Sequence, residues 1–321
     1  MTEPMIGVVL LNLGGPESEE EIPLFLRRLL SDPDVVPIPW PIRPLLARVI
    51  AHQRKDRVVH HYRAIGGKSP IGEQTRAQVQ AIQARLGNGY LVRHVFRHSA
   101  PWARDVVREL SNLEVRRLIA LPAYPQWSRS TTGSALADLE QAAKGCSLAV
   151  RAVRSYPAAP GWIEALRSLL FPLLEDGTHV IFSAHGLPAR SIRRGDPYVG
   201  EVQETAAALA ALLPRGTGHS LAFQSRLGPV EWTRPYLTDE LCRLGTAGCR
   251  AVVVVPVSFV CENLETRYEL DSETAEWARQ CGISSYHRVP TPGCHPAFIE
   301  ELALQVQRTT REAGWEKKHG E

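Results

Sequence analysis

The sequence predicts an α/β protein made of two similar halves, each a parallel sheet covered by helices. Short apolar segments of strand length alternate with helical segments along the 321-residue chain, and the alternation restarts after the linker SYPAAPG at residues 155–161. Alternation of this kind is typical of parallel sheets with helices on both faces. We expect one domain over residues 1–156 and a second over residues 157–321, with the last helix packing back on the first domain.

Four strands are expected in the first half, at residues 6–12, 91–96, 117–122 and 148–153. Helices are expected at residues 75–86, 101–110 and 135–144. A further helix is expected to begin at Ser18, which fits a capping box with Glu21.

Prolines at positions 37, 39, 41 and 44 argue against a long helix over residues 37–46. This segment is predicted to be an apolar loop around Trp40. Such a loop packs under the domain, lines an apolar ligand site or touches a membrane surface.

The second half repeats the alternation, with strands expected at residues 179–184, 219–223, 251–256 and 285–289. Helices are expected at residues 162–174 and 297–311. The strand at 251–256 holds four consecutive valines, so it is apolar on both faces, as in the middle of a parallel sheet.

The composition is that of an ordinary globular enzyme. Charged residues make up 22% of the chain and the net charge is +3, which is too small to indicate binding to nucleic acid. The sequence contains no secretory signal and no apolar run of the roughly 18 residues that span a bilayer. The chain is therefore expected to be cytoplasmic.

Six cysteines are present, and none of them forms a C-x-x-C pair, which excludes a zinc ribbon and a thioredoxin motif. In a cytoplasmic protein, six separate thiols are expected. The alternative is a cluster built from Cys242, Cys249, Cys281 and Cys294.

Two glycine-rich turns resemble nucleotide-binding loops without matching them. The glycine pair after the first strand lacks the G-x-G-x-x-G pattern. The stretch GGKS at 66–69 suggests a Walker A loop, but Tyr62 stands where that motif needs a glycine and Pro70 interrupts the following helix. No nucleotide is therefore predicted. Arg63 and Ser69 are suited to bind a carboxylate, or belong to an ordinary turn.

Acidic residues follow the strand at 251–256. At helical spacing, Glu262, Glu265 and Glu269 project from one face, which by itself indicates only a solvated helix. His185 follows the strand at 179–184. Because the carboxyl ends of strands in an open α/β sheet border the ligand crevice, a histidine and acids at two such ends indicate a site.

Three chemistries remain open for this site. Nucleophilic catalysis would have to use Cys261, because no G-x-S-x-G elbow is present. A hydrolytic zinc site needs three firm ligands, and the H-E-x-x-H motif is absent. In the third chemistry, His185 and Glu265 hold a divalent cation only briefly and pass it on.

The loop at residues 124–134 follows the strand at 117–122 and gathers hydroxyl groups, an arginine and two aromatic rings. It is suited to hydrogen-bond a flat anionic ligand. Ser134 is equally suited to cap the helix that follows.

Seven stretches resemble one known family: LLNLGGPES (10–18), YRAIGGKSPI (62–71), VFRHS (95–99), LPAYPQWSRSTTGS (121–134), SAHGLP (183–188), FQSRLGPVEW (223–232) and PVSFVCENLETRYELD (256–271). In their residues and in their order along the chain, they are similar to the ferrochelatases, enzymes that insert ferrous iron into a porphyrin in the last step of haem synthesis.

The resemblance implies the chelatase fold, in which two Rossmann-like domains enclose a porphyrin cleft. It implies that His185 and Glu265 are the catalytic residues and metal ligands, with Glu262 and Glu269 beside them or on the proton path. The family often has Asp-His where this chain has Glu262 and Asn263, so a second imidazole is absent. The implied porphyrin contacts are Asn12, Trp40, Arg63, Ser69, Tyr124, Ser128, Ser130 and Trp232.

The resemblance also indicates substrates and partners. Asn12 stands where relatives acting on coproporphyrin place a tyrosine, so protoporphyrin IX is favoured as the acceptor of Fe²⁺. The alternatives are coproporphyrin III, cobalt in place of iron, or non-catalytic haem binding and transfer. Some members hold a [2Fe-2S] cluster, for which Cys242, Cys249, Cys281 and Cys294 are the ligands to consider. Peripheral contact with a membrane and with other enzymes of the haem pathway are further expectations.

Overall fold

The computed structural model describes residues 5–36, 41–226, 228 and 230–315. Its core is two four-stranded sheets in which every strand pair is parallel, as the sequence predicts. The first sheet has the order β2 (Tyr90–Phe96), β1 (Ile6–Asn12), β3 (Arg117–Pro122), β4 (Ala149–Ala152). The second has the order β6 (His219–Gln224), β5 (His179–His185), β7 (Ala251–Pro256), β8 (Ser285–Arg288).

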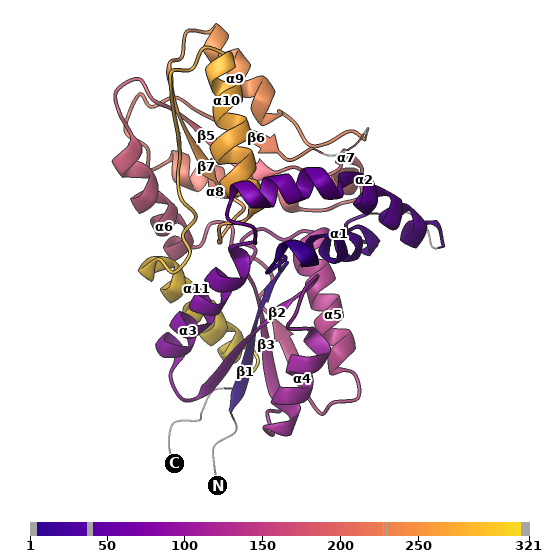
Figure 1. Ribbon diagram of the computed structural model, residues 1–321. Helices are drawn as coiled ribbons and strands as arrows, with labels where there is room; N and C mark the ends of the chain where they lie inside the picture. Colours follow the sequence, from indigo (N-terminus) through magenta and orange to yellow (C-terminus); the bar gives the residue numbers. More distant parts are fainter. Residues whose placement is uncertain (1–4, 37–40, 227, 229, 316–321) are drawn as a thin grey trace.

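The two sheets therefore have the same topology, and β1 and β5 are each the second strand in the order of their sheet. Figure 1 shows them one above the other, with the helices around them. The helices that flank the sheets are α3 (Ile71–Leu86), α4 (Ala103–Asn112), α5 (Ser134–Ala143), α6 (Pro160–Leu170), α8 (Tyr198–Ala210), α9 (Leu237–Thr246), α10 (Ala275–Gln280) and α11 (Pro296–Glu312). Shorter helices are η1 (Glu19–Glu21), η2 (Arg129–Gly133), η3 (Phe171–Leu173) and α7 (Ala189–Arg193).

Alternate residues of the central strands pack on opposite faces, because side chains of a strand point to the two sides in turn. In β1, Val9 and Leu11 join a cluster with α4 and α5, while Val8 and Leu10 join one with α3 and α11. The valines of β7 divide in the same way between two clusters. A strand with both faces covered must be apolar throughout, which explains its unbroken valine run.

The two halves share one apolar core. The cluster that contains Val8 and Leu10 continues through Trp162 of α6 and Phe298 of α11 to Phe182 of β5. Helix α11 packs against both α6 and α3, so it lies against elements that come both early and late in the chain. The domain boundary at residues 156 and 157 stays a prediction.

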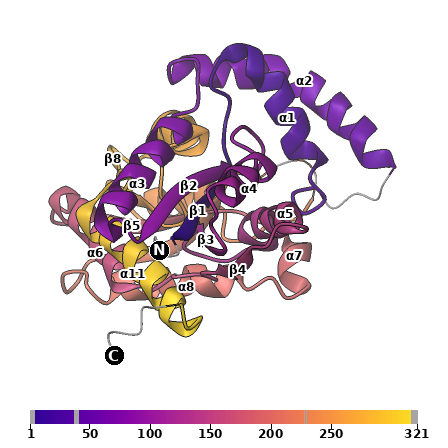
Figure 2. The same cartoon turned by 90° about the horizontal axis from the view of Figure 1, so that it is seen from below.

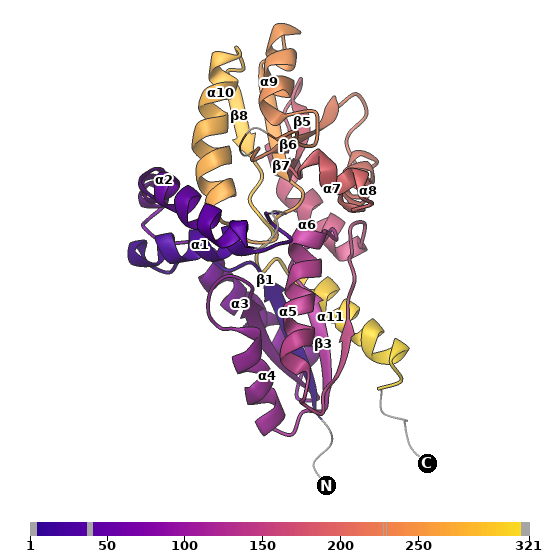
Figure 3. The same cartoon turned by 90° about the vertical axis from the view of Figure 1, so that its right-hand side faces the viewer.

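Helices α1 (Ile22–Ser31) and α2 (Ile42–Ala64) form a pair that lies at the level between the two sheets and projects beyond them (Figures 1, 2 and 3). They have a small apolar core of their own, which includes Ile22, Leu26 and Ala51. The pair therefore lies where it can border a site between the sheets.

The prediction of a loop over residues 37–46 is wrong for its second part, because α2 begins at Ile42. Pro41 precedes the helix and Pro44 lies in its first turn, where no backbone N–H is needed for an internal hydrogen bond. Trp40 lies outside the described residues. The capping box at Ser18 is also wrong: its side chain makes no capping bond, and Glu21 instead accepts a hydrogen bond from the backbone N–H of Glu17.

Among the described residues, no helix combines the length and the apolar character that crossing a bilayer requires.

The turn after β1 depends on Gly14. Its φ of +82° lies in the left-handed region, and a Cβ placed there would lie 2.2 Å from Oγ of Ser99 and 2.7 Å from Cβ of Phe96. Both the backbone conformation and the close packing therefore require glycine.

Gly14→Ala is expected to lower the free energy of unfolding by about 3 kcal/mol or more, because backbone strain and overpacking add. The control is Gly145→Ala, where φ is +83° but nothing lies within 4 Å of an added Cβ. This change should cost about 1 kcal/mol, from strain alone. Urea unfolding of the two variants measures the difference, and equal losses would refute the steric argument.

Candidate active site

His185 is the last residue of β5 and is half-buried. Its backbone N–H donates to Oγ of Ser258, which follows β7, at 3.0 Å. Its ring Nδ1 lies 2.7 Å from the carbonyl oxygen of Gly186. Since a carbonyl oxygen can only accept, Nδ1 carries the proton, and the lone pair of the neutral ring is on Nε2. His185 is thus held in the tautomer that can accept a proton or bind a metal at Nε2.

Aromatic rings flank the imidazole of His185. The ring centroid of Trp232 lies 6.5 Å away and that of Phe259 lies 6.4 Å away. Gly186 allows this arrangement, because a Cβ there would lie 2.9 Å from the carbonyl oxygen of Gln224 and 3.4 Å from the Trp232 ring. Gly186 therefore lets the ends of β5 and β6 approach each other.

The two carboxylates Glu265 and Glu269 come from η4 (Glu265–Thr274), a π-helix that runs on into α10. Glu269 accepts hydrogen bonds from Ser225, through the backbone N–H at 2.7 Å and through the hydroxyl. Burial raises the pKa of Glu269; the Ser225 bonds and the neighbouring His185 act in the opposite direction, and the charge of Glu265 raises it further. Glu269 is therefore close enough to both His185 and Glu265 to interact with each of them electrostatically.

Glu262 does not share the helix face expected for the three acids, because η4 begins only at Glu265. Its carboxylate binds Arg288, with Nη1 at 2.9 Å, and accepts hydrogen bonds from Thr266 and from the backbone and side chain of Thr291. Burial alone would raise the pKa of Glu262, but Arg288 and these hydrogen bonds leave it lowered. In this geometry Glu262 anchors the segment between β7 and η4.

Tyr62 of α2 is buried near Glu265. Burial raises the pKa of its phenol, the charge of Glu265 raises it further, and a hydrogen bond with Ser69 opposes the change. Ser69 is itself buried and its Oγ accepts from the backbone N–H of Ile71. Tyr62 therefore links the turn that carries Ser69 to Glu265 of the second half.

Asn12, at the end of β1, is buried and donates from Nδ2 to Oγ1 of Thr75 at 3.0 Å. The same amide lies 3.8 Å from Sγ of Cys261, which follows β7. Asn12 thus connects the carboxyl end of the first sheet to that of the second.

The loop around Ser128 connects the two halves at another edge. Oγ of Ser128 donates to Asp196 at 3.1 Å and lies 3.1 Å from Oγ of Ser130. The hydroxyl of Tyr124 is buried without a hydrogen-bond partner among the described residues, and burial raises its pKa. The expected capping of α5 by Ser134 is not seen; Oγ of Ser134 donates to Asp32 instead, at 2.7 Å.

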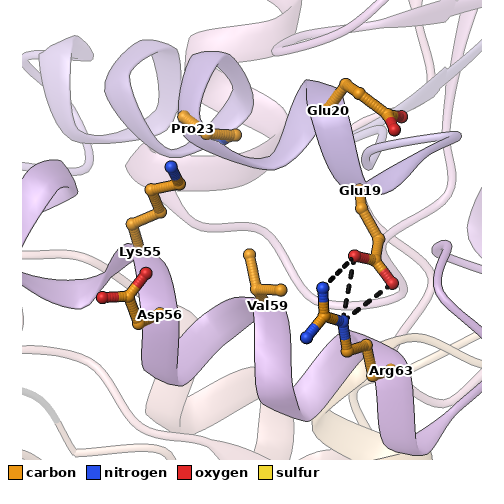
Figure 4. Close-up of a pocket in the computed structure, with 7 residues that line it drawn as sticks. All are labelled: Glu19, Glu20, Pro23, Lys55, Asp56, Val59 and Arg63. Carbon is orange, nitrogen blue, oxygen red and sulfur yellow. Dashed lines mark hydrogen bonds and ion pairs between the residues drawn. The ribbon is translucent and has the colours of Figure 1, made fainter.

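Arg63 is two-thirds exposed and pairs with Glu19, with Nη2 to Oε2 at 2.8 Å. The pair borders a cavity of about 600 Å³ between η1, α1 and α2, which Figure 4 shows together with Lys55 and Asp56. Of the described residues that line this cavity, none is His185, Glu265 or Glu269.

The four cysteines considered for a cluster do not fit one. Cys242 and Cys281 form a disulfide, with Cα atoms 4.8 Å apart, and Cys249 donates to the carbonyl of Ala251. Within the part of the chain that the structure describes, no group of three His, Cys, Asp or Glu side chains could hold a metal ion. The expectation of six separate thiols is wrong for this pair as well.

Sequence reasoning missed three residues of the site: Tyr62, Ser225 and Phe259. Each lies within a stretch that resembles the family, so the sequence indicated the segment but not the role of this side chain. Ser225 has a φ of +65°, a conformation that turns the chain after β6 so that its N–H and hydroxyl both face Glu269. No local sequence signal indicates this for a serine.

Comparisons with known proteins show the family to which the chain belongs. The ferrochelatase family model matches residues 5–310. The chain is 39% identical over 318 residues to the ferrochelatase of Nostoc punctiforme, covering 94% of this chain and 81% of that protein. It is 36% identical over 324 residues to that of Rippkaea orientalis, covering 96% and 83%.

Solved structures resemble the whole chain in fold. SirB from Bacillus subtilis with Fe³⁺ gives a TM-score of 0.63 at 10% identity, covering 97% of this chain and 99% of that one. CbiX, the terminal enzyme of sirohaem biosynthesis in denitrifying bacteria, gives 0.52 at 15% identity, covering 95% and 98%. At such identities the likeness concerns the fold alone, which is that of the chelatases.

Glu262→Gln is expected to lower the free energy of unfolding at pH 7 by about 2 kcal/mol, because the charge-assisted hydrogen bonds of its carboxylate are weakened while Arg288 keeps Asp271 as a partner. The lowered pKa of Glu262 stabilises the fold above its ordinary value of 4.5, and this contribution is lost as the pH falls through the folded value. The variant should therefore lose less stability than the parent between about pH 5 and pH 3. Denaturant unfolding across that range measures both effects.

The control is Glu276→Gln, which breaks an exposed pair with Arg279 and should leave stability close to that of the parent. A Glu262→Gln protein as stable as this control would refute the anchoring role.

Proposed function

Because the chain belongs to the ferrochelatase family and is therefore an enzyme that inserts a metal ion into a porphyrin, we propose that it converts Fe²⁺ and protoporphyrin IX into protohaem at His185, Glu265 and Glu269. The observation that carries this assignment is the imidazole of His185, with Nδ1 bonded to a carbonyl and with Glu269, which in turn interacts with Glu265, close enough to interact with it electrostatically.

Metal insertion removes two protons from pyrrole nitrogens and requires the metal to lose its water. His185 accepts a pyrrole proton at Nε2, because neutral imidazole is a suitable base near pH 7. Trp232 and Phe259 provide an apolar environment that suits the flat macrocycle.

Glu265 is proposed to bind the metal, and Glu269 to take up the second proton. Carboxylate oxygen and imidazole nitrogen are both ligands of Fe²⁺, so Glu265 and His185 can replace its water stepwise. Glu269, whose pKa is raised by burial, is suited to take up the second proton and pass it outward. Glu262, already bound to Arg288, acts by holding η4 in place rather than as a proton carrier.

The apolar face of α2 is proposed as the rim over the porphyrin. Ile42, Leu45 and Val49 follow helical spacing and are 61%, 67% and 45% exposed. The same face is suited to peripheral contact with a membrane surface, which is the alternative use of an exposed apolar stripe beside arginines.

Asn12 supports protoporphyrin IX over coproporphyrin III, since its amide is engaged with Thr75 and brings no phenol to the site. We do not extend the proposal to a [2Fe-2S] cluster, because the disulfide uses two of the four sulfurs.

The function is tested by mixing protein, Fe²⁺ and protoporphyrin IX without air, with coproporphyrin III and Co²⁺ in parallel reactions. Loss of porphyrin fluorescence together with catalytic appearance of a haem spectrum supports the proposal. Faster turnover of coproporphyrin III, or turnover with Co²⁺ alone, would replace the substrate or the metal. Stoichiometric binding without turnover would contradict the reaction.

His185→Ala is expected to lower the rate of iron insertion by about 10²–10⁴-fold, because the proton acceptor is lost. Porphyrin binding, followed by fluorescence quenching, should persist. The control is His219→Ala, an exposed residue at the opposite end of the same sheet, which should keep full activity. If His185→Ala instead loses porphyrin binding, His185 positions the substrate and does not take its proton.

Leu45→Gln is expected to raise KM for the porphyrin by about tenfold and to leave kcat unchanged, because an apolar contact of about 1–2 kcal/mol is removed. Steady-state kinetics without lipid measure this. If KM is unchanged but sedimentation with anionic vesicles is lost, the stripe contacts a membrane and not the porphyrin.

A further inference from the structure

The helix of the acidic pair is in contact with α2 through a pair of rings. His61 of α2 stacks on Tyr268 of η4, with ring centroids 4.0 Å apart and an angle of 18° between the planes. Figures 1 and 3 show α2 beside the lower end of the η4–α10 helix, so the contact joins the first half of the chain to the second. The side chain of His61 is only 15% exposed.

Charged groups surround this stack on both elements. From η4, Oε1 of Glu273 lies 4.0 Å from Nε2 of His61 and 3.5 Å from Nη2 of Arg57. From α2, Nε of Arg57 donates to Nε2 of His61 at 3.4 Å, while Arg54 and His60 act on it electrostatically. An imidazole nitrogen that accepts from a guanidinium is unprotonated, so the stacked ring is neutral.

Tyr268 lies where a small movement would reach the site. It follows Glu265 by three residues and directly precedes Glu269 on the same helical segment. Leu264, just before η4, packs against the apolar core of the α1–α2 pair. Helix α2 therefore contacts η4 through Leu264 at its start and through Tyr268 within it.

We propose that His61 is a positioning residue for metal insertion: by stacking on Tyr268 it fixes the first turns of η4, and so the placement of Glu265 and Glu269 relative to His185. This inference rests on the proposed function, since those carboxylates are the groups to be placed. It assigns a role to a residue on the opposite half of the chain that touches neither the metal nor the porphyrin.

The proposal has a pH signature. Burial lowers the pKa of His61, with Glu273 opposing and Arg57, His60 and Arg54 reinforcing the change. A histidine with a lowered folded pKa stabilises its contact above the ordinary value of 6.5, and the contribution is lost as the pH falls through the folded value. The contact should therefore weaken on the acid side of about pH 6.5 and be intact at pH 8.

The test compares His61→Ala with His61→Phe, which keeps a stacking ring but cannot take up a proton. At pH 8, His61→Ala is expected to lose about tenfold in kcat, because displacing catalytic groups by a fraction of an ångström is costly, while KM for porphyrin changes less than twofold. His61→Phe should restore kcat to within about twofold. The ratio of kcat for His61→Phe to that of the parent should rise as the pH falls from 8 to 5.5.

The matched control is His52→Ala, which removes an exposed imidazole elsewhere on α2 and should change neither kcat nor the pH profile. The contact is also tested without activity, through the Tm values of His61→Ala, Tyr268→Ala and the double variant. Coupled residues give a double variant little less stable than either single one.

Parental kcat in His61→Ala, or a flat kcat ratio between His61→Phe and the parent, would overturn the positioning role. Additive losses of Tm would show that the rings do not interact. If the parent inserts no iron, the proposed function fails, and the Tm cycle still decides whether the contact exists. Should His61→Ala fail to fold, His61→Phe and its pH ratio decide alone.

Discussion

The site depends on the hydrogen bond from Nδ1 of His185 to the carbonyl oxygen of its own neighbour, Gly186. This bond fixes the ring orientation and leaves Nε2 with its lone pair, which a freely rotating imidazole would present only part of the time. The carbonyl is available because Gly186 has no side chain to collide with Gln224 on β6. The chemistry proposed at Nε2 thus depends on how closely two parallel strand ends approach.

The carboxylates are held by a second set of restraints that come from other strand ends. Ser225, which follows β6, donates a hydrogen bond to Glu269. Arg288, at the end of β8, binds Glu262, which precedes η4 in the chain. The contacts of α2 with Leu264 and Tyr268 add a restraint from the first half. Because the groups come from separate segments, their relative placement is a property of the whole fold.

Sequence patterns predicted the strands well, since a strand buried on both faces must be a short apolar run. The bounds of β1, β3 and β7 are those expected. Helix α2 was not foreseen, because Pro41 stands directly before it and Pro44 lies in its first turn, where a proline is tolerated. The position of Glu262 was misjudged because nothing local indicates that the chain turns toward Arg288 before η4 begins. His185 and Glu265 were marked by motif, while the roles of Ser225 and Tyr268 depend on contacts made across long separations in sequence.

The return of α11 to the first half has a consequence for how the protein is made. The face of the first sheet that carries Val8 and Leu10 is completed by the last helix, whose Phe298 packs on Trp162 with ring centroids 5.5 Å apart. On the ribosome the early strands emerge first, yet the helix that seals this face is synthesised some 140 residues after the last of them, at the ordinary pace of translation. Until that moment an apolar sheet surface is exposed to water and to other nascent chains. Chaperone dependence during synthesis would thus follow from the placement of a single terminal helix.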